Sequence, residues 1–392
     1  MIYLDNAAST AVHPEVVKEM LPYFDLQYGN PSSIHQFGRK AKNAIQKARK
    51  QVAALVGAEP DEILFTSGGT ESNNTILYGG FKAKTSRGLV IGENHIITSS
   101  IEHEAILQPC QRITQNGFKV TYLPVDEHGS IDPNDITDSI TEDTVLVSIM
   151  FANNEVGTIQ PIKEISEICK KYQIPLHTDA VQAVGKVPIN VKDLGVDALS
   201  ISSHKINGPK GIGALFIKKG LMVTPQILGG GQENGMRSGT ENVVSIVGFG
   251  KACEIAKDKL SDNISHFHSL YLSMLTKTIK EITHVKLNGH PEKRIFNNIH
   301  LTFMGVNGED LIIKLDEHGI AASTGSACSV HTQKASHVLQ AMGFNHEQIT
   351  GSLRLSFGYT NTLDEINQTV EVLKKVVPEL RSVSPYKTKY NF

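Results

Sequence analysis

Short apolar runs that alternate with helical stretches constrain the fold of this chain most strongly. The apolar runs cover residues 63–66, 96–99, 120–123, 145–150, 175–178, 198–202 and 214–217. Stretches with apolar residues at helical spacing lie between many of them, such as residues 162–172, and a long one at 34–56 precedes them. Strands that alternate with helices are typical of a mostly parallel sheet covered by helices. The sequence therefore predicts an α/β architecture.

The pattern changes after about residue 250. We expect one long helix over 251–279, short strands at 298–303 and 353–357, and a closing helix over 364–380. A chain of 392 residues exceeds what one hydrophobic core usually serves. We therefore predict a large α/β domain over 15–253, and a smaller α+β domain formed by 1–14 and 254–392.

Charge and hydropathy exclude several classes of protein. The formal net charge is -2, and basic residues are scattered among acidic ones. No global basic field therefore points to nucleic acid or to an anionic membrane. No apolar run is long enough to span a bilayer, and the first residues, MIYLDNAAST, lack the pattern of a secretory signal. We expect a cytoplasmic protein without a direct nucleic-acid or membrane partner.

The four cysteines, Cys110, Cys169, Cys253 and Cys328, are far apart and form no CxxC pair. This spacing argues against a zinc site or a redox dithiol, and no metal is predicted. The first three lie in helix-like surroundings and are expected to be small buried hydrophobes. Cys328 differs because Gly and Ser residues surround it, and such a segment disfavours a rigid helix or strand. A buried structural cysteine is the alternative at this position.

A glycine-rich turn follows the first apolar run. The segment TSGGTESNN, which begins at Thr66, leads from a predicted strand into a predicted helix. Free amides at the start of a helix, together with the hydroxyl of Thr70, can hold a phosphate. The alternative is an ordinary turn capped by Ser or Thr. By itself this signal is weak.

Two further strand ends carry an acid and an amine. Asp179 follows one apolar strand, and Lys205 lies between the next strand and the loop INGPKG. A carboxylate at such an edge can face a ligand cation, and a lysine in a crevice can form a Schiff base. Each residue alone has an ordinary alternative: Asp179 could cap the next helix, and Lys205 could be a solvated loop lysine. Together with the phosphate cradle, they fit pyridoxal phosphate.

With these residues in place, the chain resembles the fold-type I pyridoxal-phosphate enzymes, and specifically the cysteine desulfurases of the NifS/IscS family. The resemblance rests on ordered motifs that run nearly from end to end: YLDNAAST, YGNPSSIHQFG, TSGGTESNN, IEHEAI, NNEVGTIQP, HTDAVQAVGK, SSHKINGPKGIGAL, GGGQENGMRSGTEN, STGSACS and SLRLSFG. Any single motif is weak evidence, whereas their joint order is specific. The resemblance implies conversion of L-cysteine to L-alanine, with the sulfur passing to Cys328 as a persulfide.

The resemblance also implies a role for each matching residue. Lys205 would bind the cofactor covalently and shuttle protons, Asp179 would pair with the ring nitrogen, and His103 would stack on the ring and serve as an acid/base. The remaining implied contacts are Gln182 with the ring hydroxyl; Gly69, Thr70, Ser202 and His204 with the phosphate; Thr240 with the phosphate of a neighbouring subunit; and Asn154 with Arg354 at the substrate carboxylate. Asn154 is also counted among the cofactor-binding residues. Thr240 thus implies a homodimer.

Local readings remain open for several of these residues. His103 suits the first turn of an ordinary helix, Asn154 a turn, Arg354 an edge ion pair and Thr240 a helix cap. The loop that carries Cys328, about 321–335, resembles the long-loop class, whose members serve iron–sulfur scaffold proteins and tRNA thiolation relays. The alternatives for function are a selenocysteine lyase or another pyridoxal-phosphate lyase, an aminotransferase, and a non-catalytic scaffold protein that kept the fold.

Overall fold

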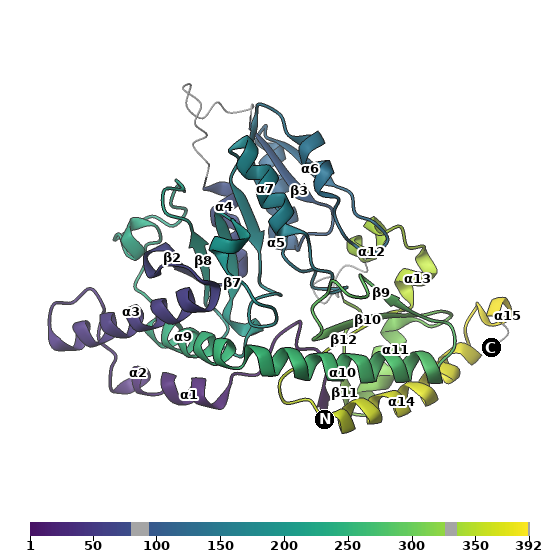
Figure 1. The fold of residues 1–392 in the computed structure, drawn as a ribbon. Helices are drawn as coiled ribbons and strands as arrows, with labels where there is room; N and C mark the ends of the chain where they lie inside the picture. Colours follow the sequence, from purple (N-terminus) through teal and green to yellow (C-terminus); the bar gives the residue numbers. More distant parts are fainter. Residues whose placement is uncertain (80–93, 326–334, 391–392) are drawn as a thin grey trace.

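A seven-stranded sheet forms the centre of the molecule (Figure 1). The computed structural model describes residues 1–79, 94–325 and 335–390. The strands follow the order β2-β8-β7-β6-β5-β3-β4. Their bounds are β2 (Ile63–Thr66), β3 (His95–Ser99), β4 (Lys119–Leu123), β5 (Thr144–Ser148), β6 (Leu176–Asp179), β7 (Ala198–Ser202) and β8 (Gly213–Ile217). In this part of the chain, β8 alone runs antiparallel to its neighbours. The predicted, mostly parallel sheet is confirmed.

Helices cover both faces of this sheet because successive strand residues point to opposite sides. In β2, Ile63 and Phe65 pack into one core, whereas Leu64 packs into another. The first core is completed by α3 (Gln36–Val56), α7 (Ile162–Tyr172) and α9 (Val243–Asp258). The second is completed by α4 (Gly69–Tyr78) and α5 (Glu104–Gln115). A strand buried on both faces reads as a continuous apolar run, which is why the sequence revealed it.

A separate core lies under the second half of the chain. Its sheet has the order β12-β10-β9 and is antiparallel, with β9 (Val285–Asn288), β10 (Asn298–Phe303) and β12 (Ser352–Ser356). The helices α10 (Leu260–Glu281), α11 (Gly308–Glu317) and α14 (Leu363–Ser382) cover it (Figure 1). Ile2 and Leu4 join this core from the N-terminal segment. We propose on this basis that residues 1–14 and 254–392 form one domain and residues 15–253 the other.

The prediction of one helix over 251–279 is wrong. The structure has two helices there, α9 and α10, which meet end to end at Lys259 (Figure 1). Lys259 has φ -100° and ψ 8°, so it leaves the helical region without any glycine or proline nearby to announce the break. The break falls where the chain passes from the first core to the second.

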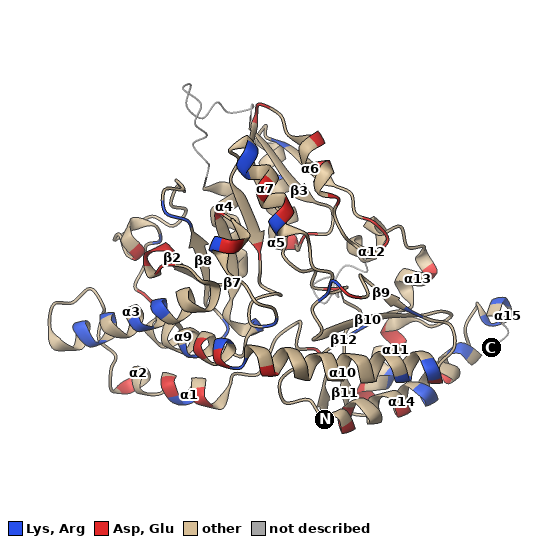
Figure 2. Ribbon diagram, in the orientation of Figure 1, with Lys and Arg blue, Asp and Glu red and all other residues tan. Residues whose placement is uncertain are grey.

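The other described elements are short. They are β1 (Ile2–Tyr3), which pairs in parallel with β11 (Ile320–Ala321); α1 (Pro14–Met20), α2 (Pro22–Asp25), α6 (Pro133–Ser139), α8 (Val191–Leu194), α12 (His337–Ala341), α13 (His346–Thr350) and α15 (Lys387–Tyr390); and the 3₁₀ turns η1 (Pro60–Glu62), η2 (Ser203–Lys205) and η3 (Glu233–Gly235). Basic residues lie along α3, acidic residues occur in α1, and both kinds occur along α14 (Figure 2). Among the helices of the described residues, none is long and apolar enough to cross a membrane.

A buried ion pair attaches the segment that contains η3 to α3. Glu233 lies 2.5 Å from Nη2 of Arg49, and the two side chains are 5% and 9% exposed. The same carboxylate accepts a hydrogen bond from the backbone N–H of Phe65 at 3.0 Å. Arg49 in turn donates to the carbonyl oxygen of Ile63. This network joins the segment to both α3 and β2.

Replacement of Glu233 by Ala should lower the free energy of unfolding by about 3–5 kcal/mol, because it leaves the Arg49 guanidinium buried without its partner. The matched control is Glu19→Ala, which removes an exposed partner of Lys47 at 3.0 Å. That loss should be about 1 kcal/mol or less. Urea unfolding of both variants measures the difference, and equal losses would contradict the role assigned to the buried pair.

Candidate active site

Asp179 ends β6 with a carboxylate that is nearly buried, at 7% exposure. One oxygen accepts a hydrogen bond from Nδ2 of Asn73 at 2.6 Å, and the other accepts from the backbone N–H of Val181 at 3.0 Å. The second contact shows that the carboxylate caps the following turn; because no helix of the described residues begins there, the alternative of a helix cap is wrong. Among the ion pairs of the described residues, none involves Asp179. A buried carboxylate in these surroundings suits a cationic ligand.

Lys205 lies directly after the adjacent strand. Asp179 pairs in register with Ser200 of β7, and η2 then carries Lys205 beyond the same edge of the sheet. The ammonium nitrogen Nζ donates hydrogen bonds to the backbone carbonyls of Ala7 and Ala8, the latter at 2.8 Å. The N-terminal segment therefore closes one side of the site. Sequence reasoning missed Ala7 and Ala8 because a backbone carbonyl leaves no side-chain signal.

His103 interacts electrostatically with both Asp179 and Lys205. It is the N-cap of α5, and its Nδ1 accepts a hydrogen bond from the backbone N–H of Ala105 at 3.0 Å. In the neutral ring the proton must therefore be on Nε2. Burial lowers the pKa of His103; the nearby Asp179 carboxylate raises it, and the Lys205 ammonium lowers it. The structure thus brings His103, Asp179 and Lys205 together.

The start of α4 forms an open cradle. Gly68, its N-cap, has φ 155° and provides no side-chain cap. A Cβ on Gly69 would lie 2.7 Å from Cγ2 of Val181, so only glycine fits there. Uncapped amides at a helix N-terminus suit a phosphate. Thr70 in the first turn is exposed and reachable.

Ser202 and His204 leave the end of β7 beside this cradle. Ser202 is buried, and its Cβ lies 3.7 Å from a Cβ placed on Gly69. His204 contacts Ser9 through Nδ1 at 3.3 Å. Burial, followed by the charges of Lys205 and Lys210, lowers the pKa of His204 to about 4, so its ring is neutral near pH 7. Hydroxyl, imidazole and amide donors at one edge fit a phosphate, and the carboxylate of the neighbouring strand fits a ring nitrogen.

Gln182 joins the N-terminal segment to a lysine that sequence reasoning did not identify. Its Nε2 donates to the carbonyl oxygen of Ala7 at 3.0 Å, and its Oε1 accepts from Nζ of Lys186 at 3.3 Å. Lys186 is a buried residue, four positions further along the chain. The sequence offers no sign of this contact, since most lysines are solvated.

Arg354 is buried and makes several polar contacts. It lies in β12, is 2% exposed and forms an ion pair with Asp5 at 2.9 Å, which confirms the local reading of an ion pair. Its Nη1 donates to the carbonyl oxygens of Asn154 and Gly325 at 2.9 and 3.1 Å. Asn154 therefore contacts Arg354 through its backbone. The acid that completes this contact, Asp5, was missed because it lies 349 residues away in the chain.

Cys328 lies outside the described residues. On one side of it, Gly325 is bound by Arg354; on the other, the hydroxyl of Ser336 donates to the buried Glu155 carboxylate at 2.6 Å. Glu155 is the residue after Asn154, so both flanks attach to the same part of the site. By contrast, the cysteines at 110, 169 and 253 are buried in helices, which confirms their prediction.

Thr240 is exposed and lies in the segment attached by Glu233. Its alternative interpretation as a helix cap is wrong, because α9 begins further along the chain and has another N-cap. Asn242 caps α9 instead, by accepting a hydrogen bond from the backbone N–H of Ser245. A second contact holds this segment to α4, between Arg237 and Glu71 at 3.1 Å. This contact places Arg237, three residues before Thr240, beside the start of α4 in the same chain.

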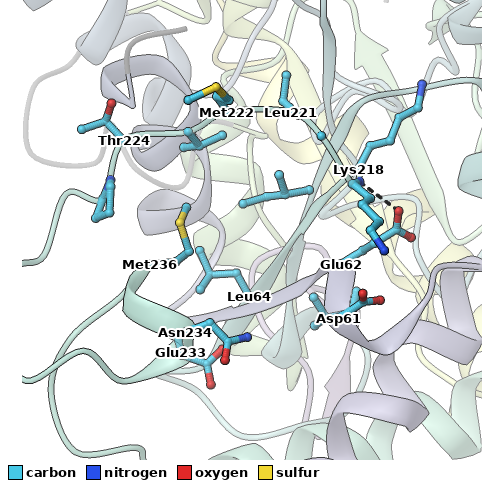
Figure 3. Close-up of a pocket in the computed structure, with 16 residues that line it drawn as sticks. Asp61, Glu62, Leu64, Lys218, Leu221, Met222, Thr224, Glu233, Asn234 and Met236 are labelled. Carbon is cyan, nitrogen blue, oxygen red and sulfur yellow. Dashed lines mark hydrogen bonds between the residues drawn. The ribbon is translucent and has the colours of Figure 1, made fainter. Parts of the chain in front are cut away.

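Two hollows of comparable size occur in the described residues. One, of about 520 Å³, lies at the β2 and β8 edge (Figure 3), and its walls include Glu62, Leu64, Lys218, Met222 and Met236. None of the described residues that were predicted for the site lines it. The other, of about 450 Å³, has Lys186 and Lys205 in its walls and extends to the junction of α9 and α10. Among the described residues predicted for the site, Lys205 is the one that lines this second hollow.

The fold and the site define a pyridoxal-phosphate enzyme of fold type I, since an acid, an amine and an anion cradle meet at the carboxyl ends of parallel strands. Comparison with known proteins agrees. The family described as Aminotransferase class-V matches residues 2–369. The cysteine desulfurase IscS of Dictyoglomus turgidum is 48% identical, over 99% of this chain and 98% of its own. That of Methanosarcina thermophila is 50% identical, over 98% and 94%.

Solved structures give the same result. A NifS-like protein superposes with a TM-score of 0.90 at 38% identity, over 97% of this chain and all of its own. The structure of SspA in complex with cysteine has a TM-score of 0.79 at 36% identity, over 91% and 99%. This chain belongs to the class-V aminotransferase family and, within it, to the cysteine desulfurases of the IscS and NifS kind.

Proposed function

We propose that this cysteine desulfurase uses pyridoxal phosphate to convert L-cysteine to L-alanine and places the sulfur on its own Cys328. The balance is L-cysteine plus the Cys328 thiol giving L-alanine plus a Cys328 persulfide. The observation that carries the proposal is geometric: Asp179 ends β6, and Lys205 follows the adjacent strand β7 at the same edge of the sheet. A non-catalytic scaffold would have no need to keep this arrangement.

The cofactor would be held by residues that fit its separate parts. Asp179 would bind the ring nitrogen, Lys205 the aldehyde carbon and Gln182 the ring hydroxyl, with His103 against the ring. The phosphate would bind at the start of α4, where it reaches Gly69, Thr70, Ser202 and His204. When bound, this cofactor accepts the electron pair released at the substrate α-carbon.

The chain's own residues would place the substrate and move its protons. Arg354 and Asn154 would bind the substrate carboxylate, for which a guanidinium fork is well suited. Lys205 would take the proton from the substrate α-carbon and later return a proton to the product. These roles need Arg354 to share its donors between Asp5 and the substrate.

The sulfur step requires a thiolate at Cys328, because the thiolate is the nucleophile. The thiolate sulfur forms a bond to the substrate sulfur while the carbon–sulfur bond breaks. His103 would hold or move the proton, since its lowered pKa leaves the ring neutral near pH 7. The attachment of both flanks beside Asn154 supports this approach of Cys328.

We expect His103→Gln to lower turnover by about 10²-fold, because a positioned acid/base is removed. In the parent enzyme, turnover should fall only as the pH drops below about 6.5, the ordinary histidine value, since the folded pKa is lower. In the variant, this fall in turnover on the acidic side of the pH profile should be absent. His318→Gln, at the exposed end of α11, is the control and should keep both rate and profile. An unchanged acidic limb in the His103 variant would contradict the assignment.

A homodimer is proposed as well, with Thr240 reaching the phosphate of the neighbouring subunit. Two apolar exposures support it: α1, α2 and the following turn expose Leu21, Phe24, Leu26 and Ile34, and the segment before Thr240 exposes Leu228. Clusters of this kind mark interfaces. The persulfide acceptor is proposed to be an iron–sulfur scaffold protein or a sulfur relay for tRNA thiolation. The expected cytoplasmic location stays a prediction.

The test is to incubate the purified, cofactor-loaded protein with L-cysteine and a thiol reductant, and to measure alanine and sulfide. Yellow protein and equal amounts of the two products are the expected result. A keto acid in place of alanine would indicate an aminotransferase. A strong preference for selenocysteine would indicate a selenocysteine lyase. Protein that cannot be reconstituted to colour would support a scaffold role.

A further inference from the structure

Lys186 is a buried lysine that the proposed reaction does not use. It is 8% exposed and has no carboxylate partner among the ion pairs of the described residues. Burial, followed by the positive charges of Lys205 and Arg354, lowers the pKa of Lys186 to about 7. A buried cation without a counter-ion destabilises a fold, so a specific contact must account for it.

The contact that Lys186 makes is to the side-chain amide of Gln182, at 3.3 Å. One of the two partners of this amide donates a hydrogen bond, and the other accepts one. The carbonyl of Ala7 can only accept, and Lys186 in its protonated form can only donate. The amide is therefore held with Oε1 toward Lys186 and Nε2 toward the N-terminal segment. One N–H of Nε2 is used by Ala7, and the second is left for another acceptor.

We propose that Lys186 is a positioning residue that fixes the Gln182 amide with its N–H donors toward the active site. The inference rests on the proposed function, in which Gln182 donates to the ring oxygen of the cofactor. With the amide reversed, Oε1 would face that oxygen and the carbonyl of Ala7, and three acceptors would meet without a proton. Lys186 makes this reversal unfavourable because an N–H₂ group would then face an ammonium.

A rival explanation is that Lys186 acts directly, through its charge. Lys205 and Arg354 feel this charge, and so does His204, whose pKa it helps to lower. Loss of a nearby cation makes any protonated nitrogen in the site harder to deprotonate. The two explanations differ in one respect: the positioning role needs Gln182, and the direct charge effect does not.

The experiment compares the cofactor-loaded parent with Lys186→Met, Gln182→Ala and the double variant. The readout is the pH at which the visible absorbance band of the bound cofactor changes. A ring oxygen that loses its donor becomes more basic, so each single variant should raise this midpoint by about one pH unit, which equals about 1.4 kcal/mol. The double variant should match Gln182→Ala, because Lys186 then has no amide to orient.

A further upward shift in the double variant, equal to that caused by Lys186→Met alone, would overturn the proposal in favour of the direct charge. An unshifted midpoint in Lys186→Met would overturn it as well. Lys186→Gln decides the matter if the Met variant does not fold. It retains an N–H donor without charge, so the positioning role predicts the parent midpoint and the charge effect predicts a shift. A parent protein without any band would instead refute the proposed function.

Discussion

The variant Lys205→Ala should be colourless and should lose at least about 10³-fold in turnover, because it removes both the covalent attachment of the cofactor and the proton carrier at the α-carbon. In the structure, Nζ of Lys205 is held at the site by two backbone carbonyls. The absorbance spectrum of the reconstituted protein and the rate of alanine formation measure the two effects separately.

The control for this change is Lys210→Ala in the same loop. Lys210 is exposed, five residues further on, so its loss should leave colour and rate close to those of the parent. A Lys205→Ala protein that keeps its visible band would show that another amine holds the cofactor. Lys186 would then be the first candidate, since it lines the same cavity as Lys205.

The second large effect is expected for Cys328→Ser. This variant should bind the cofactor and change its spectrum when L-cysteine is added, yet form alanine at least about 10³-fold more slowly, because a hydroxyl is a poor nucleophile toward sulfur. The two halves of the result separate cofactor and substrate binding from sulfur transfer. Sulfide production at the parent rate would show that Cys328 is not the acceptor.

Cys169→Ala is the matched control for the loss of a thiol. Cys169 is buried in α7, where burial raises its pKa to about 12, so it is not a thiolate near neutral pH. Its replacement should lower the free energy of unfolding by about 1 kcal/mol and leave turnover unchanged. Cys110 in α5 behaves in the same way, with its pKa raised to about 12 by burial.

The seven-stranded sheet could be predicted because its strands are buried on both faces and appear in the sequence as apolar runs. Strands β2 and β7 have the predicted bounds. The break at Lys259 could not be predicted, since no glycine or proline marks it. It is imposed where the chain leaves one core for the other. Such a tertiary constraint is invisible to a local pattern.

The same distinction applies to the site. Asp179 and Lys205 could be found from the sequence because each follows a strand in a recognisable turn, and the family resemblance supplied their roles. Ala7 and Asp5 could not, since their contacts to Lys205 and Arg354 join residues that are 198 and 349 positions apart in the chain. Lys186 escaped notice for a different reason: its charge suggests the surface, whereas the fold buries it beside Gln182.

The most direct measurement is the mass of the peptide that carries Cys328, after brief incubation of the cofactor-loaded enzyme with L-cysteine and without reductant. We predict that this peptide gains one sulfur atom, that the gain is reversed by a thiol, and that one equivalent of alanine appears. Alanine formed while the peptide keeps its original mass, or a sulfur found on another cysteine, would contradict the proposed transfer to Cys328.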